Sequence, residues 1–212
     1  MSLVVHGRAS SSNVQAVMWG IAELGLEVER RDVGGRFGGT DTPDFLAMNP
    51  MGKVPVLQDG DVTLFESAAI LRYLVARHSD GPLRDPMPEA DAWAEWAKHS
   101  MARALILDVF WPFYRTPEPE RDMAAVLAGL RGFERLAAMA MARRGARRFL
   151  MGDALCLADI WAGHVLWRYF TLDLPREAPA GLDAYYAALC DNPHYARHVM
   201  VDYSELAARR DF

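Results

Sequence analysis

Short β-forming runs alternate with helically spaced apolar residues over the first third of the chain. The runs LVVH at 3–6, LEVERRDV at 26–33 and VTLF at 62–65 predict strands. Apolar positions recurring at helical spacing predict one helix over about 14–25 and another over about 66–77. These patterns indicate strand-helix-strand units, which pair their strands in parallel through a right-handed crossover.

The run KVPVL at 53–57 reads as a buried strand with a proline in its middle, followed by the turn signal Asp59-Gly60. Thr42-Pro43 opens a single helical turn that we expect to end near Leu46. The element order becomes β-α-β-α-β-β-α, with the last two strands forming an antiparallel hairpin.

The pattern changes after residue 79. Residues 80–90 read DGPLRDPMPEA, and their three prolines predict a linker between domains. From residue 91 onward apolar positions recur at helical spacing and no run has a strand pattern. We therefore expect an α/β domain over 1–79 and an all-α helical bundle over 91–212.

Composition and charge narrow the possible partners. The chain has 212 residues, 51% of them hydrophobic, which is ample for a packed core. A net charge of -5 and a pI near 5.7 favour small molecules or another protein over nucleic acid or an anionic membrane. The basic cluster at 143–148 is typical of a helix C-terminus. No signal peptide or membrane span is evident, so we expect a cytoplasmic protein.

Four polar residues mark the start of the first helix. Ser10, Ser11, Ser12 and Asn13 are all favourable N-cap residues, and the N–H groups at a helix start attract anions such as a thiolate or carboxylate. The alternative is that one serine caps the helix while the others are solvated.

Two further features belong to the same end of the sheet. At the second helix start, Glu66 and Ser67 can hold a carboxylate and an ammonium group, or can act as a simple cap. A cis bond before Pro55 would turn the backbone of Val54 outward toward a ligand; a trans proline starting an edge strand is the alternative. Together these features indicate a short peptide ligand with a thiol, an amino group and a carboxylate.

With these motifs in this order, the sequence resembles the cytosolic glutathione S-transferases, in particular bacterial members of the serine-type, theta-like group. The resemblance covers the whole chain, and its specific part is the block NPMGKVPVL followed by ESAAILRYL. It implies a thioredoxin-like N-terminal domain that binds glutathione, a helical domain that holds the electrophile, and a homodimeric enzyme of detoxification.

The resemblance also implies roles for individual residues. Pro55 would be the cis-proline, and Val54 would pair its backbone with the cysteinyl part of glutathione. Glu66 and Ser67 would hold the γ-glutamyl end, while Lys53 would reach the glycyl carboxylate.

The resemblance assigns the catalytic hydroxyl to Ser11, five residues before Ala16-Val17, with Ser12 and Asn13 close enough to replace or assist it. There is no tyrosine in LVVHGR and no cysteine at 10–13, where the other types of transferase keep their catalytic group. A hydroxyl donor together with helix N–H groups would stabilise the thiolate of glutathione, whose thiol is only slightly ionised at neutral pH.

The aromatic run DVFWPFYR is the candidate electrophile pocket. Phe110, Trp111 and Tyr114 crowd together with Arg115 beside them, which suits a flat or anionic acceptor. A helix–helix packing seam is the alternative. In the glycine-rich loop, Arg36 and Phe37 belong either to a flap near the ligand or partner subunit, or to a flexible surface loop.

Two other positions have chemical interest. Cys156 stands where the family normally has a helix-capping serine or threonine, and a thiol caps less well unless Asp159 or Asp153 compensates. His194 and His198 share helical spacing, but no third ligand is placed with them, so we expect no metal cofactor.

The leading hypothesis is a dimeric glutathione S-transferase that uses glutathione as co-substrate against small hydrophobic electrophiles. The same site could serve a glutathione-dependent reductase, dehalogenase or isomerase. A non-catalytic ligand-binding or scaffold protein of the same fold is the third possibility.

Overall fold

A four-stranded mixed sheet forms the first part of the computed structural model, which describes residues 3–79, 81, 83 and 88–209. The strand order is β2 (Val28–Arg31), β1 (Leu3–His6), β3 (Val56–Asp59) and β4 (Val62–Phe65). β1 runs parallel to β2 and antiparallel to β3, and β3 and β4 form the expected hairpin. The predicted order β-α-β-α-β-β-α is confirmed.

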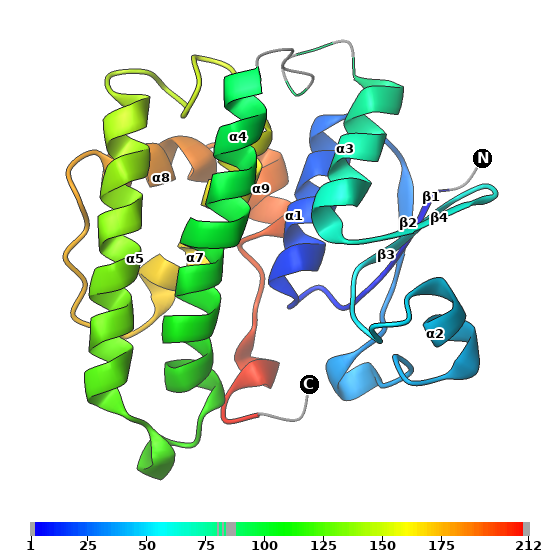
Figure 1. Cartoon of the computed structure of the whole chain (residues 1–212), viewed down its shortest axis with the longest axis horizontal. Coiled ribbons are helices and arrows are strands. Elements are labelled where there is room, and N and C mark those ends of the chain that lie inside the picture. The colour runs from blue at the N-terminus through cyan, green and yellow to red at the C-terminus, as the bar shows by residue number, and fades with distance from the viewer. Residues whose placement is uncertain (1–2, 80, 82, 84–87, 210–212) are drawn as a thin grey trace.

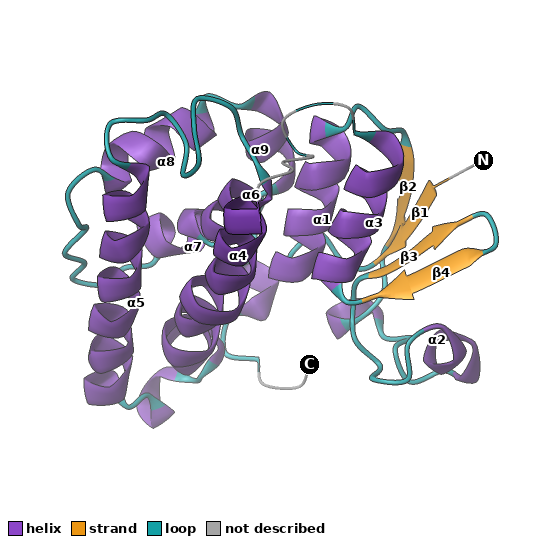
Figure 2. Cartoon of the chain, turned by 45° about the horizontal axis from the view of Figure 1, so that its top comes forward, coloured by secondary structure: helices purple, strands orange, loops and turns teal. Residues whose placement is uncertain are grey.

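Two helices cover one face of this sheet. Figure 2 shows α1 (Ser12–Glu23) and α3 (Ser67–His78) side by side between the strands and the rest of the molecule. The short helix α2 (Pro43–Met48) lies away from them and contacts β4. Thr42 caps α2 by accepting a hydrogen bond from the N–H of Phe45, as the sequence Thr-Pro favours.

The second half of the chain is helical (Figure 1). A long helical column begins with α4 (Pro88–Trp96) and continues through the π-helical stretches η2 (Ala97–Ala102) and η3 (Ala104–Arg115). The remaining helices are α5 (Met123–Arg144), α6 (Leu157–Gly163), α7 (Leu166–Thr171), α8 (Leu182–Cys190) and α9 (Pro193–His198). Three short 3-10 turns complete the described chain: η1 (Gly35–Phe37), η4 (Glu118–Glu120) and η5 (Ser204–Leu206).

The element boundaries differ from the sequence expectations at several places. The strand expected over 26–33 is shorter, and β3 begins only after Pro55 because a proline cannot donate to the sheet ladder. Most of the expected linker, residues 80, 82 and 84–87, falls outside the described residues, and α4 already begins at Pro88. None of the described helices is long and apolar enough to cross a membrane.

One continuous core joins the two halves of the chain. α1 packs against α3 on one side and against α6 and α9 on the other. Trp19 of α1 is fully buried and meets the ring of Tyr195 edge-on at 4.9 Å. A Cβ on Gly163 of α6 would lie 2.7 Å from Leu189 and 3.2 Å from the Trp19 ring, so the absence of a side chain there lets α1 pack closely on α6. α1 is therefore anchored in the core at the seam between the sheet and the helices.

Asp159 compensates for the weak cap at Cys156. Its buried carboxylate accepts hydrogen bonds from the N–H groups of Cys156 and Leu150 and from the Tyr185 hydroxyl, at 2.9–3.0 Å. The Cys156 thiol also donates to this carboxylate at 3.2 Å. The carboxylate therefore supplies the N3 half of a capping box, and the thiol of Cys156 stands where a serine or threonine hydroxyl would normally supply the other half.

Candidate active site

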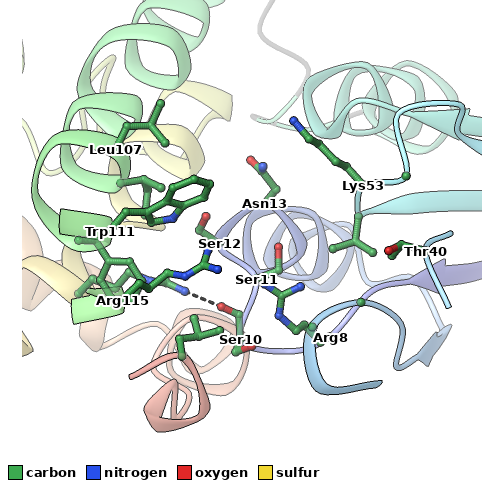
Figure 3. A pocket seen from close by; sticks show the side chains of 18 of the residues that line it. Arg8, Ser10, Ser11, Ser12, Asn13, Thr40, Lys53, Leu107, Trp111 and Arg115 are labelled. Atoms are coloured by element: carbon green, nitrogen blue, oxygen red, sulfur yellow. Dashed lines mark hydrogen bonds between the residues drawn. The ribbon is translucent and has the colours of Figure 1, made fainter. Parts of the chain in front are cut away.

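A cavity of about 580 Å³ opens at the seam between the sheet and the helical half. Its walls come from the loop before α1, the glycine-rich loop before α2, the segment before β3, and η3. In Figure 3, Ser11, Ser12 and Asn13 lie in the middle, with Lys53 on one side and Trp111 on the other. Segments that are far apart in the sequence thus surround the start of α1.

Ser11 occupies the N-cap position of α1. Its backbone is extended, as an N-cap requires, but its side chain makes no capping hydrogen bond. The hydroxyl of Ser11 lies in the wall of the cavity beside Ser12 and Asn13. The N–H groups of the first turn of α1 have no intrahelical acceptors, so this wall favours an anion.

The segment before β3 forms the opposite wall. The Val54-Pro55 peptide bond is cis, and Lys53 and Val54 line the cavity. Pro55 itself is buried beneath them and is not among the described lining residues. Asn49 supports this turn from behind, because its side-chain amide donates to the carbonyl of Lys53 at 2.7 Å.

Glu66 and Ser67 lie one layer away from the cavity wall formed by Asn13. The Ser67 hydroxyl donates to Oδ1 of Asn13 at 3.3 Å, and Glu66 pairs with Lys98 at 3.4 Å. Neither residue is among the described residues that line this cavity. Glu66 has a φ of 67°, a conformation that is uncommon for non-glycine residues and enriched at ligand-binding sites.

The aromatic residues of η3 divide between the cavity and the core. Phe110, Trp111 and Arg115 line the cavity, and the Arg115 guanidinium stacks 4.7 Å over the Trp111 ring. Tyr114 instead stacks on Phe110 at 5.2 Å and meets Tyr203 at 5.0 Å, and it is not among the described lining residues. The aromatic run thus serves as both pocket wall and packing seam, the two alternatives that the sequence left open.

Several cavity residues are absent from the sequence-based site. Ile106 and Leu107 extend the apolar wall of η3, and their helical spacing relative to Phe110 and Trp111 is the signal that identifies them. Arg8 follows the end of β1, a position where functional side chains often lie. Arg168 and Leu206 come from distant segments and leave no local signal.

The glycine-rich loop is tied to the C-terminal segment. Arg36 forms an ion pair with Glu205 at 2.8 Å and stacks over Phe37 at 4.7 Å. Gly34 and Gly35 of this loop line the cavity and leave room for the Arg8 side chain, since a Cβ on either would come within 3.2 Å of it. The loop therefore forms a wall of the cavity, anchored at its outer side by Glu205.

A smaller cavity of about 220 Å³ adjoins the first and shares Ser12 and Asn13 with it. His164 closes its inner end and is 2% exposed. Burial lowers the pKa of His164 to about 3, so the imidazole is neutral at physiological pH. Its Nδ1 lies 2.9 Å from the carbonyl of Trp161, which assigns the proton to Nδ1 and leaves Nε2 as an acceptor.

Within the described residues, no group of three or more His, Cys, Asp or Glu side chains is arranged to hold a metal ion. His194 and His198 of α9 have no third ligand among the residues that the structure describes. Burial and nearby Arg197 lower the pKa of His198 to about 4.

Comparisons with known proteins agree with this geometry. The family models of the glutathione S-transferase N-terminal and C-terminal domains match residues 1–76 and 102–193. Glutathione S-transferase GstB of Escherichia coli (strain K12) is 33% identical over 210 residues, which cover 95% of this chain and 100% of the relative. The chain belongs to the glutathione S-transferase family. This membership confirms the family, the fold and the enzyme class that the sequence motifs predicted.

Solved glutathione S-transferase structures are similar along almost the whole chain. A theta class enzyme from Xanthomonas axonopodis pv. citri, with glutathione bound, is 38% identical with a TM-score of 0.87, covering 94% of this chain and 98% of that one. Glutathione S-transferase I from maize, in complex with an atrazine glutathione conjugate, is 26% identical with a TM-score of 0.80, covering 93% and 97%.

Proposed function

We propose that this glutathione S-transferase conjugates the thiol of glutathione to small hydrophobic electrophiles, with Ser11 as the hydroxyl that contacts the thiolate. The observation that carries the proposal is the uncapped side chain of Ser11 at the start of α1, in the wall of the cavity. Ser12 and Asn13 lie in the same wall and are the alternative donors.

Glutathione occupies the side of the cavity formed by the segment before β3. The backbone of Val54, turned by the cis bond to Pro55, pairs with the cysteinyl part, and Lys53 approaches the glycyl carboxylate. Glu66 and Ser67 hold the γ-glutamyl end at the start of α3. The theta class relative with bound glutathione supports this assignment of the ligand.

The electrophile occupies the opposite side, against η3. Phe110 and Trp111, together with Ile106 and Leu107, offer an apolar wall, and Arg115 adds a cation. Tyr114 supports this wall from behind by stacking on Phe110. The maize relative, which holds an atrazine glutathione conjugate, supports a pocket for an aromatic electrophile.

The reaction begins with loss of the thiol proton. A free thiol has a pKa near 8.5, so only a few per cent is thiolate at neutral pH, and donors that favour the anion raise that fraction. The Ser11 hydroxyl and the N–H groups at the start of α1 donate to the sulfur. The thiolate then forms a carbon–sulfur bond as the electrophile releases its leaving group or accepts the electron pair.

The partners follow from the same proposal. We expect a cytoplasmic homodimer whose ligands are glutathione and the electrophile, without a metal cofactor. Light scattering of the purified protein measures the subunit number. The electrophile is identified by assaying a panel of halogenated aromatic, epoxide and unsaturated carbonyl compounds.

Ser11→Ala tests the central assignment. We expect at least a tenfold loss of turnover with little change in glutathione affinity, since the hydroxyl acts on the thiolate and not on the rest of the peptide. Ser12→Ala and Asn13→Ala are the comparison variants. An unchanged rate in Ser11→Ala, with a loss in either comparison variant, would move the role to that residue.

A further inference from the structure

The guanidinium of Arg168 lies directly behind the loop that carries Ser11. From α7 its Nη2 donates to the carbonyl of Ser10 at 2.8 Å, and its Nη1 donates to Oε1 of Gln15 at 2.6 Å. The two contacts span 158 and 153 residues of sequence. The side chain is in the cavity wall although the residue is only 1% exposed.

This cation has no carboxylate partner among the described residues. The ion pairs of the described chain all involve other side chains, and both acceptors of Arg168 are uncharged. Its Nε is buried with no hydrogen-bond partner. The guanidinium lies over the rings of Phe110 and Tyr203, at 5.2 and 5.5 Å, which offset only part of the cost of burying a charge.

Arg168 nevertheless remains charged at neutral pH. Burial is the main cause that lowers its pKa to about 10; Tyr203 and Tyr195 oppose this shift, and nearby Arg8 adds a smaller lowering contribution to it. A buried positive charge without a protein counter-ion is costly, and an anion bound in the cavity offsets that cost.

The same side chain fixes the backbone before Ser11. Gln15 is 1% exposed, and its amide donates to the carbonyl of Ala9 at 3.0 Å while its Oε1 accepts from Arg168. The carbonyls of Ala9 and Ser10 are therefore both held by the Arg168–Gln15 pair. Ser10 is fixed from the other side, since its hydroxyl donates to Glu205.

We propose that Arg168 is a positioning residue for the glutathione thiolate, which fixes the loop carrying Ser11 and supplies an unneutralised positive charge behind it. The inference rests on the proposed function, in which the sulfur binds beside Ser11. The only chemical step involved is ionisation of the glutathione thiol. The thiol gives its proton to water, and the resulting thiolate remains opposite the guanidinium.

Other charged side chains also face this cavity and contribute to its electrostatic potential together with Arg168. Arg8, Lys53 and Arg115 are positive, and Asp41 at the outer rim is negative. The adjoining cavity contributes Lys98, His99 and Arg103, together with the neutral His164. The test must therefore change Arg168 while leaving these groups in place.

The experiment titrates the thiolate directly and through catalysis. The ultraviolet absorbance of enzyme-bound glutathione and the pH profile of kcat/KM each give the pKa of the bound thiol. We expect Arg168→Met to raise that pKa by about one unit, which lowers kcat/KM about tenfold below the pKa and leaves it little changed at high pH. Arg168→Lys keeps the charge and should retain more of the shift.

Gln15→Glu neutralises the positive charge of Arg168 while leaving the Arg168 side chain in place. The new carboxylate pairs with the guanidinium at the position of Oε1 and neutralises it, so the thiol pKa should rise as in Arg168→Met. Arg176→Met is the matched control, because this exposed arginine donates to the carbonyls of Tyr169 in α7 and of Leu172 just after it but is not among the described residues that line the cavity.

The outcomes separate this inference from the assignment of Ser11. If neither Arg168→Met nor Gln15→Glu shifts the bound thiol pKa in folded protein, Arg168 has no such role, whatever Ser11→Ala does. If both shift it while Ser11→Ala has full activity, the charge of Arg168 stands and the hydroxyl assignment fails. Loss of glutathione binding in both variants would also overturn the inference.

Discussion

Ser67 and Asn13 join the starts of α3 and α1 through a hydrogen bond of 3.3 Å, although they are 54 residues apart in sequence. The two helix starts, each of which presents unpaired N–H groups, therefore meet at one place. Asn13 lines the cavity and Ser67 supports it from behind. This contact joins Ser67, which we expect to hold the γ-glutamyl end of glutathione, to Asn13, which lies beside the expected position of the thiolate.

The first prediction concerns this coupling. Glu66→Ala and Ser67→Ala should each weaken glutathione affinity about tenfold, because each removes a hydrogen bond to a charged group of the ligand. Calorimetric titration with glutathione measures the change in Kd. Glu29→Ala, which removes an exposed carboxylate paired with Arg31, is the control. Normal affinity in both test variants would refute the γ-glutamyl assignment.

The second prediction uses two glycines of α5. A Cβ on Gly129 would lie 2.3 Å from the carbonyl oxygen of Asp108 in η3, whereas on Gly132 it would meet only the end of the Arg135 side chain at 3.8 Å. Gly129→Ala should cost about 2–3 kcal/mol of unfolding free energy by overpacking. Gly132→Ala should gain up to about 1 kcal/mol through helix propensity. Urea unfolding of both variants measures the difference, and equal stabilities would contradict the close packing of α5 on η3.

The third prediction follows from the neutral, buried His164. Its pKa falls from 6.5 to about 3 on folding, so between these values the unfolded chain binds a proton that the folded chain does not. Stability is therefore lost as pH falls through this window, by about 1.4 kcal/mol per pH unit from this group.

His164→Asn keeps a donor for the Trp161 carbonyl but does not titrate. The variant should lose about 2 kcal/mol less than the wild type between about pH 6.5 and pH 5, as measured by urea unfolding at both values. His78→Asn, at an exposed position of α3, should keep the wild-type dependence. Identical slopes in all three proteins would show that His164 does not resist protonation.

The fourth prediction concerns the start of α6. Cys156→Ser should raise the free energy of unfolding by about 0.5–1 kcal/mol, because a hydroxyl donates to Asp159 more strongly than the thiol does at 3.2 Å. Cys156→Ala should lower it. Neither change should alter kcat/KM, since Cys156 is not among the described residues that line the two site cavities. A less stable serine variant would mean that packing of the sulfur outweighs the hydrogen bond.

The sequence predicted the local backbone structure around the cavity, because each of these features has a local cause. The alternation of β-forming and helical runs predicts the sheet and its order, and Pro55 marks the turn where β3 begins. The polar cluster at 10–13 likewise marks the start of α1. Such signals depend only on neighbouring residues, so they can be recognised from the sequence without the structure.

The contacts that complete the site depend on residues distant in sequence. Arg168 lies in an ordinary helical stripe, and only the packing of α7 behind the loop at 9–11 gives its charge a role. Tyr114 shows the opposite case, because its place beside Phe110 and Trp111 predicts a pocket residue while helical rotation directs it toward Tyr203. Periodicity identifies a buried face but does not distinguish a cavity from the core behind it.

The cavity wall includes Leu206, close to the last described residue, and the same segment is tied back by the bond from the N–H of Ala208 to the carbonyl of Tyr114. During translation, the sheet and α1 emerge from the ribosome long before this segment. Until this segment has emerged, the cavity lacks Leu206 in its wall and η3 lacks the bond from Ala208. Capture on immobilised glutathione would therefore report a cavity that the segment up to Ala208 has completed, and not the first domain alone.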